Sequence, residues 1–530
     1  MKTIKTILTI ALFSVILCGC SKKSTTPPHL VAVPKNAFFV AAFDAKQIVN
    51  KAGLNKMNQF KFYSTLEREF NNLPAENAKT IKDFLKNTRS SGLNLDRIFV
   101  YASPEHNALG FSAGFTFEID NLKTFEKFID ATELASYREG NKIILPYDET
   151  TNIEWNDNIL VISTNPTNIN IFNSDEKESI LANEIFKTEY EKSNNDVCLF
   201  VDFNGFIHLA EKYTDDEELQ QFQQYKDFSI FANITTEKGS IVSTFKGFPE
   251  EKVSEIYGKF YKQDFDNIDI YKYFPEKSLF AMKFAVKPLD FYSEYKKNIG
   301  IVTDENQTET TEEETEDYYM YSRYNNYNDA IKYYIEQHDA EITSVLSCFT
   351  GDLLASFVGM TDQFQPEYAI AAGILEGKES DVISLIEKAG FKKNDNYYTL
   401  NNGIDVHFAI NNNVAYLTGS TEYISNFFGK AYNSNITSAK DYGKELKNSP
   451  SYFYWNININ DYPSILKMYT NMSEEGRMAM PLLEKLKSIS AKMNNAGEGE
   501  MRLDLTDNSE YATKTILNGI DDLLAKYFEF

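Results

Sequence analysis

The sequence predicts an α+β fold built from two tandem duplicated modules, each a mostly antiparallel sheet covered by helices. Segments of the first half recur in the same order in the second half, at an offset of about 255 residues. Short turns such as 156–158 and 411–413 separate neighbouring strand patterns, which favours antiparallel pairing. Apolar residues alternate along Phe228–Ile234, which is typical of a sheet with one buried face.

The repeated segments predict the same order of elements in both halves. Helices are expected to begin at Asn165 and Ser420, because Asn and Ser are good N-cap residues. The matched pairs are Val33–Asp44 with Phe274–Ala285, Leu95–Val100 with Gly351–Ser356, the surroundings of Gly114 with those of Gly373, Asn158–Ser163 with Asn413–Thr418, Val197–Phe203 with Tyr452–Ile459, and the strands Phe228–Ile234 and Ser240–Phe245 with Glu500–Leu505 and Tyr511–Ile516.

The first residues predict export and lipidation. The apolar run Ile7–Leu17 is too short to span a bilayer, which takes about 20 residues, but suits a signal peptide. It ends in Leu17-Cys18-Gly19-Cys20, which resembles the bacterial lipobox. We therefore expect a lipoprotein signal peptide at 1–19, acyl chains on Cys20 that hold the chain on a membrane, and a tether at 20–33. An ordinary secretory signal that contains cysteines is the alternative.

The repeat places the first module at 34–262 and the second at 270–530. The second contains an acidic, tyrosine-rich insertion at about 302–328, and we predict that it is disordered because like charges repel and bury nothing. A calcium-binding site is the more specific alternative for this insertion. However, Thr303–Asp317 lacks the alternating ligands and central glycine of an EF-hand loop.

Charge and cysteine content limit the partners. The formal net charge of −24 repels nucleic acid and anionic lipid headgroups, so neither is expected as a partner. Beyond Cys18 and Cys20, the chain has only Cys198 and Cys348. They form either two buried free thiols, which is the blander interpretation, or a disulfide, which an exported protein allows.

Catalytic and metal-binding patterns are scarce, so we predict no enzyme, no cofactor and no metal. Gly110-Phe111-Ser112-Ala113-Gly114 fits the G-x-S-x-G elbow of hydrolases, but a turn precedes it and strand alternation follows it. A glycine and serine inside a strand is the preferred interpretation. No two histidines have metal-ligand spacing among His29, His106, His208, His338 and His407.

The chain resembles an uncharacterised lipoprotein family of Bacteroidetes, known as domain of unknown function 4836. The lipobox, the opening Val33–Ala37 strand and the strand-to-helix steps at Asn165 and Ser420 carry the resemblance. It implies no activity and no functional residue other than Cys20. Surface-exposed lipoproteins of that phylum resemble one another in acidic residues after the lipidated cysteine, whereas Ser21-Lys22-Lys23 follow Cys20 here. We therefore expect the outer membrane, facing the periplasm.

The main functional hypothesis is a membrane-anchored, non-catalytic envelope lipoprotein that binds or scaffolds an envelope protein or another macromolecule. A carrier of lipid or another hydrophobic ligand is the second hypothesis, because a curved antiparallel sheet backed by helices can hold an apolar ligand. A hydrolase with a site between the modules is the third. An apolar cavity, an exposed apolar patch or a polar cleft would each favour a different one of these.

Overall fold

The computed structural model describes most of the chain from Thr26 onward. The signal peptide, Cys20, His106, the expected helix start at Asn165 and residues 302–326 of the acidic insertion lie outside the described residues. The described ranges are 26–64, 68, 79, 82–83, 88–104, 110–144, 151–164, 176–211, 223, 225–262, 264–265, 268–299, 301, 327–361, 365–401, 405–429, 432–494 and 497–527.

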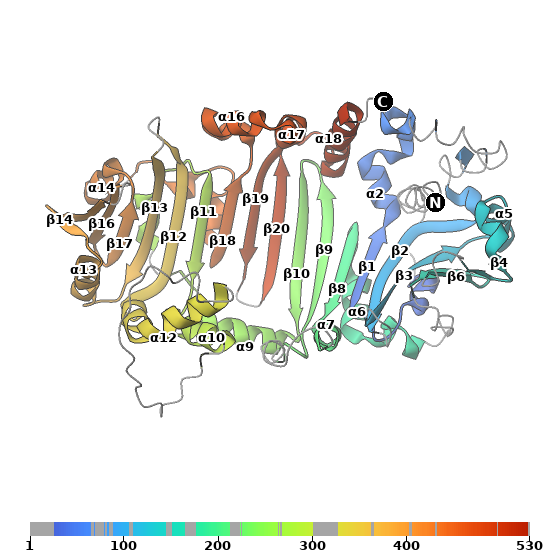
Figure 1. Ribbon diagram of the computed structural model, residues 1–530, viewed down its shortest axis with the longest axis horizontal. Coiled ribbons are helices and arrows are strands. Elements are labelled where there is room, and N and C mark those ends of the chain that lie inside the picture. The colour runs from blue at the N-terminus through green and yellow to red at the C-terminus, as the bar shows by residue number, and fades with distance from the viewer. Residues whose placement is uncertain are drawn as a thin grey trace. The chain divides into compact units, whose positions relative to one another are not determined.

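Two compact units make up the structure, and neither is a continuous stretch of chain. Unit 1 comprises 1–253, 457–489 and 498–530, and unit 2 comprises 254–456 and 490–497. The colours of Figure 1 show this interleaving, because red C-terminal strands and helices occur in the same unit as blue N-terminal ones.

The strand pairings of the described residues are antiparallel. The strands of unit 1 are β1 (Phe39–Asp44), β2 (Leu93–Pro104), β3 (Phe111–Ile119), β4 (Arg138–Glu139), β5 (Lys142–Ile144), β6 (Asn152–Trp155), β7 (Ile159–Ser163), β8 (Val197–Asp202), β9 (Ser229–Glu237), β10 (Ser240–Phe248) and β20 (Glu498–Leu505). Those of unit 2 are β11 (Phe280–Ala285), β12 (Phe349–Met360), β13 (Pro366–Ile374), β14 (Lys392–Asn394), β15 (Tyr397–Asn401), β16 (Asp405–Asn411), β17 (Val414–Thr418) and β18 (Ser451–Asn456). Strand β19 (Leu486–Met493) is divided between the units.

The helices are short, and no described helix combines the length and apolar character needed to cross a membrane. They are α2 (Ala45–Ala52), α5 (Leu122–Asp130), α6 (Glu184–Lys192), α7 (Phe203–Ala210), α9 (Glu250–Phe260), α10 (Pro288–Asn298), α12 (Tyr327–Leu346), α13 (Glu379–Lys388), α14 (Thr421–Phe428), α15 (Gly443–Asn448), α16 (Ser464–Met472), α17 (Glu474–Leu483) and α18 (Ala512–Tyr527). Ser420 is the N-cap residue of α14, as predicted.

The order of strand pairing recurs along the chain. β1 pairs with β2 and β8, and β11 pairs with β12 and β18. β3 pairs with β2 and β7, and β13 pairs with β12 and β17. The helices and antiparallel strands together are those of an α+β protein.

The predicted tandem arrangement is nevertheless wrong. All twenty strands belong to one sheet, and the C-terminal strand β20 pairs along its length with β10, from Ser240↔Asp504 to Lys246↔Glu498. A tandem module would end in β10 with its backbone groups unpaired, and an exposed edge of this kind readily accepts another strand. Because β20 takes that place, the end of the chain belongs to the unit that its beginning forms.

The predicted strand Tyr511–Ile516 is also wrong, because residues from Ala512 onward form α18. Tyr511, Thr513 and Thr515 alternate as in a strand. However, apolar residues three and four apart, Ala512, Ile516, Ile520 and Leu523, give a helical face that extends further along the chain. The strand that precedes β20 along the chain is β19, Leu486–Met493.

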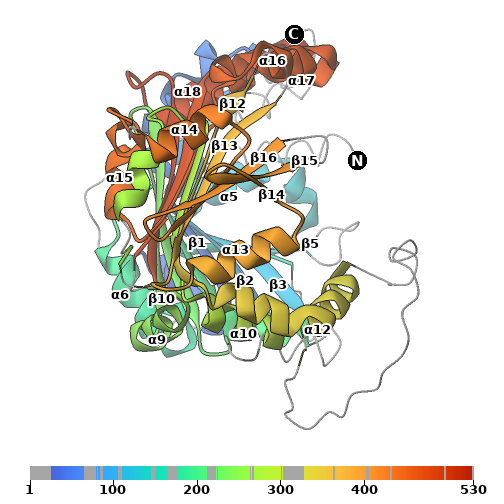
Figure 2. The ribbon, with the colours of Figure 1, turned by 90° about the vertical axis from the view of Figure 1, so that its left-hand side faces the viewer.

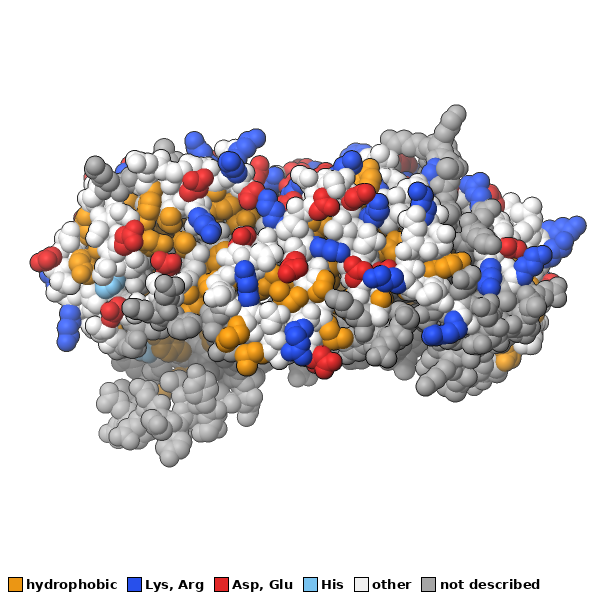
Figure 3. Space-filling view, turned by 90° about the horizontal axis from the view of Figure 1, so that it is seen from above, with side chains coloured by type: hydrophobic (Ala, Val, Ile, Leu, Met, Phe, Trp, Pro, Cys, Tyr) orange, Lys and Arg blue, Asp and Glu red, His pale blue; other side chains and the backbone are white. Residues whose placement is uncertain are grey.

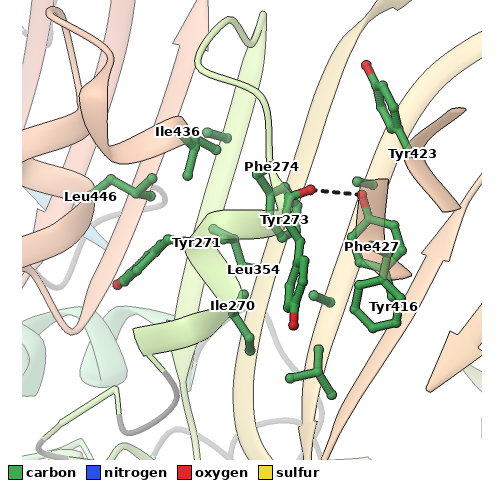
Figure 4. Packing of buried hydrophobic residues seen from close by; sticks show 14 of the residues in the cluster. Ile270, Tyr271, Tyr273, Phe274, Leu354, Tyr416, Tyr423, Phe427, Ile436 and Leu446 are labelled. Carbon is green, nitrogen blue, oxygen red and sulfur yellow. Dashed lines mark hydrogen bonds between the residues drawn. The ribbon is translucent and has the colours of Figure 1, made fainter. Parts of the chain in front are cut away.

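The core of unit 2 packs on one side of its strands. Small residues of the strands, such as Ala281 and Ala371, leave room for aromatic side chains of the 3-10 helix Ile268–Tyr273 and of α14. Figure 4 shows this packing, in which the Tyr416 hydroxyl donates to the Tyr273 carbonyl at 3.1 Å. Neighbouring residues of β17 belong to two different clusters. Tyr416 lies in this core, and Ala415 lies in the cluster under α13.

Helices therefore lie on both sides of the unit 2 strands. Figure 2 shows α14 and α15 on one side and α13 on the other. The cluster under α13 includes Val382 of the helix, together with Phe408 and Ala415 of the strands. This second cluster includes residues of β16 and β17, which pair with each other towards one end of the series of strands in unit 2.

The core of unit 1 begins before β1. Pro28–Ala32 form a 3-10 helix, and Leu30 and Val33 are buried in one cluster with Phe99 and Phe200. The packed part of the chain therefore starts within the stretch 20–33 that was expected to be a tether. Ile98 and Phe125 belong to a second cluster, which involves α5.

Candidate functional site

The G-x-S-x-G segment has no hydrolase geometry. Ser112 is buried and is the second residue of β3, which continues without a turn to Ile119. A Cβ atom at Gly114 would lie 2.4 Å from the ring of Tyr101, so the glycine is explained by the tyrosine that packs on it. The interpretation as a glycine and a serine inside a strand is confirmed.

Histidines and cysteines do not assemble into a site. Within the described ranges, no group of His, Cys, Asp or Glu side chains could hold a metal ion. Cys198 and Cys348 are free and buried, which confirms the interpretation as two thiols. His208 and His338 are exposed beside glutamates on their own helices, whereas His29 and His407 are buried.

A buried polar cluster in unit 2 was not predicted. Lys283 of β11 is 1% exposed, and its Nζ donates to the Tyr271 hydroxyl at 3.0 Å and to the Lys447 carbonyl at 3.3 Å. Burial lowers the pKa of Lys283 to about 8, against the opposing field of Asp352. Asp352 itself forms an ion pair with Lys262 at 2.8 Å. These groups satisfy one another beneath the helices, so the cluster is part of the core.

The opposite side of the same strands is an apolar surface. In strand register, Trp455, Phe280, Phe357 and Tyr368 form one row across β18, β11, β12 and β13. We call the whole surface the unit 2 open face, and it consists of three such rows. The second row is Phe453, Met282, Ala355 and Ile370, and the third is Phe284, Leu353 and Ala372.

The unit 2 open face is accessible to solvent. Trp455 is 45% exposed and Ile370 is 37% exposed, and the other members of the rows are partly exposed. None of them belongs to the buried clusters of the unit. The rings of Phe280 and Phe453 pack edge to face with centroids 5.3 Å apart, so the large side chains support one another across the strands.

Two apolar faces on one antiparallel sheet are unusual. Such a sheet commonly buries one face and presents polar side chains on the other. Here the helix-covered face holds Ala281 and Leu354, while the open face holds Phe280 and Phe357. Figure 3 shows hydrophobic side chains at the surface among charged ones, in a view from above. Large exposed apolar patches are typical of binding surfaces in soluble proteins.

The dimensions of the unit 2 open face follow from strand geometry. Neighbouring strands lie about 4.8 Å apart, so a row across four strands extends about 14 Å between the outer backbones. That length is close to the hydrocarbon depth of one membrane leaflet, about 15 Å. A row therefore has the length of an acyl chain.

Sequence reasoning missed this surface, although a signal was present. The strands Phe280–Ala285, Tyr368–Ile374 and Tyr452–Trp455 are nearly continuous apolar runs in which both alternating sets are hydrophobic. In antiparallel strands this pattern indicates two apolar faces. Helices cover one of them here, and on the other side α13 covers residues of β16 and β17. Cys20, the predicted lipidation site, lies outside the described residues.

Comparisons with known proteins give one match. A family model described as "Domain of unknown function (DUF4836)" matches residues 31–512, which is most of the chain. No curated protein and no solved structure matches it.

Proposed function

The chain belongs to the DUF4836 family, and because the description of that family assigns no activity, we propose a function from the unit 2 open face. The protein is a non-catalytic lipid-binding protein, in which acyl chains of an uncharged or zwitterionic lipid lie on the rows of this face. The observation that carries the proposal is the second apolar face of an antiparallel sheet whose first face is already covered.

The chemistry of the face fits acyl chains better than a protein partner. Its rows contain no charged side chain, and the hydroxyl of Tyr368 and the indole nitrogen of Trp455 are their only polar side-chain groups. Protein interfaces carry about one hydrogen bond per 100–200 Å². An acyl chain makes none, so a face with so few donors and acceptors is complementary to it.

The charge of the chain limits which lipid binds. A formal net charge of −24 disfavours anionic headgroups and also disfavours a second copy of the same chain stacked on the face. The expected lipid anchor at Cys20 would in addition keep the protein beside a membrane, where such ligands are abundant. We also propose that the protein is anchored in the cell envelope, at the outer membrane and facing the periplasm.

Trp455 offers a direct test, because the chain has only two tryptophans and the other, Trp155, is 2% exposed. Phosphatidylethanolamine with brominated acyl chains should quench Trp455 fluorescence in a Cys20→Ser protein, since bromine quenches on contact. The quenching should disappear in Trp455→Phe, in which only the buried Trp155 emits. Equal quenching in both proteins would contradict the proposal.

A matched pair of substitutions locates the site. Ile370→Asp places a carboxylate in the second row, and lipid affinity should fall at least tenfold, about 1.4 kcal/mol. Phe291→Asp is the control, because Phe291 is 50% exposed on α10 of the same unit and lies outside the rows. If both variants bind lipid as the parent does, the unit 2 open face is not the binding surface.

The anchor has its own test. Replacement of Cys20 by serine should move the protein from the membrane pellet to the soluble fraction, because a serine hydroxyl does not receive the lipid of a lipobox cysteine. An unchanged distribution between the fractions would contradict anchoring through Cys20, without bearing on the lipid that the open face binds.

A further inference from the structure

We infer that unit 1 carries a second, separate lipid site, so that each chain binds two lipids. The inference rests on the proposed function and extends it to a surface whose strands all lie in unit 1. We call this surface the unit 1 open face, and it lies on β2, β1, β8, β9, β10 and β20. Its residues are Phe39, Ala41, Val100, Ala102, Val197, Leu199, Val201, Ile230, Ala232, Ile234, Phe245 and Met501.

Strand register brings these residues onto one face. Val100, Ala41, Leu199, Ala232 and Phe245 form a single row through five strands, by the pairings of β2 with β1, β1 with β8, β8 with β9 and β9 with β10. Ala41 is buried among them, and the other members of this row are partly exposed. The face is as free of charged side chains as the one in unit 2.

The alternation in β20 shows that this face is the apolar side of an amphipathic strand. Met501 and Leu503 point to the open face, and Glu500, Arg502 and Asp504 point to the other. Arg502 forms ion pairs with Asp504 at 2.7 Å and with Glu237 at 3.5 Å on that polar side. Ion pairs hold Arg502 on the polar side, whereas Met501 is 51% exposed on the apolar side.

A glycine shapes the face where β10 meets β20. Phe245 pairs in register with Gly499, and a Cβ atom at Gly499 would lie 2.1 Å from the ring of Phe245. The tip of the ring therefore lies over the glycine and continues the apolar row onto β20. A side chain at Gly499 would displace the ring and break this surface.

The two faces differ in composition. The unit 1 open face is mainly aliphatic, with Leu199 between two alanines at the centre of its row, and the unit 2 open face is mainly aromatic. Aliphatic side chains and a row without hydrogen-bonding groups suit an acyl chain. The negative charge of the protein again selects an uncharged or zwitterionic lipid and disfavours a second copy of the chain.

Native mass spectrometry tests the number of sites. The Cys20→Ser protein, loaded with phosphatidylethanolamine, should retain two lipids per chain. Met501→Asp should retain one lipid and keep the quenching of Trp455 by brominated acyl chains. Met472→Asp is the matched control, because Met472 is 66% exposed on α16 of the same unit and lies outside the face. It should retain two lipids.

The outcomes separate the two proposals. If the parent protein retains one lipid, and this lipid is lost in Ile370→Asp but kept in Met501→Asp, the second site is overturned and the proposed function stands. If the parent protein retains one lipid, only Met501→Asp loses it and Trp455 is not quenched, then the site in unit 2 and the number of two lipids per chain are both overturned. Two lipids in Met501→Asp would also overturn the inference, and circular dichroism shows whether each variant is folded.

Discussion

Two buried basic side chains contribute to the pH dependence of the protein's stability. Lys283 and His29 are almost fully enclosed, and in both cases burial disfavours the protonated form. A folded-state pKa below the unfolded-state value means that the unfolded chain binds more protons over the interval between the two values. The free energy of unfolding therefore rises with pH across each interval.

For Lys283 this interval is alkaline. Its pKa falls from 10.5 to about 8, so the free energy of unfolding should rise between pH 8 and pH 10.5. Lys283→Met removes the buried charge and should stabilise the protein at pH 7 by about 1 to 3 kcal/mol, with a flatter profile in that interval. Urea unfolding at several pH values measures this. Lys388→Met, an exposed change on α13, is the control, and equal profiles for both variants would contradict the argument.

For His29 the interval is acidic. The Nδ1 atom of His29 has no hydrogen-bond partner among the described residues, and its Nε2 atom lies 3.1 Å from the Arg97 carbonyl oxygen. Burial lowers the pKa of His29 to about 3. The free energy of unfolding should fall as pH drops from 6.5 towards 3, by up to about 1.4 kcal/mol per unit. His29→Leu should lose this part of the acid sensitivity in thermal melts, while the exposed His208→Gln should keep it.

At the scale of elements, the pairing of β10 with β20 decides which parts of the chain fold together. A fragment of residues 34–262 contains the predicted first module but leaves the β10 edge unpaired, and it lacks Leu30 of the core. We expect it to aggregate or to form dimers through that edge, which size-exclusion chromatography detects. A monomeric fragment with cooperative unfolding would contradict this expectation.

The repeated elements also show why the tandem arrangement was mistaken. β7 and β17 were predicted from Asn158–Ser163 and Asn413–Thr418, because a short apolar run between turn residues is a local signal. The partner of an edge strand is not local. Glu500–Leu505 was correctly predicted to be a strand, but its sequence does not say that β10, about 250 residues earlier, lies beside it.

At the scale of the whole molecule, charge should select among lipids. The net charge of −24 repels an anionic headgroup, and salt screens that repulsion, since the Debye length falls from about 30 Å at 0.01 M to 3 Å at 1 M. Phosphatidylglycerol should therefore bind more weakly than phosphatidylethanolamine at low salt, and the difference should shrink at high salt. A titration of Trp455 quenching measures both lipids, and a difference that does not depend on salt would contradict this account.

Local patterns determined much of this protein. Alternation, turns and caps predicted most strands and α14, because these signals depend on neighbouring residues. Only the tertiary structure decided that β20 completes unit 1, that Lys283 is buried, and that Phe280, Phe357 and Trp455 share an exposed face. Those outcomes depend on contacts between distant segments. The helices of the main unit 2 core pack on one apolar side of these strands, and a sequence in which both sides are apolar does not state which side that is.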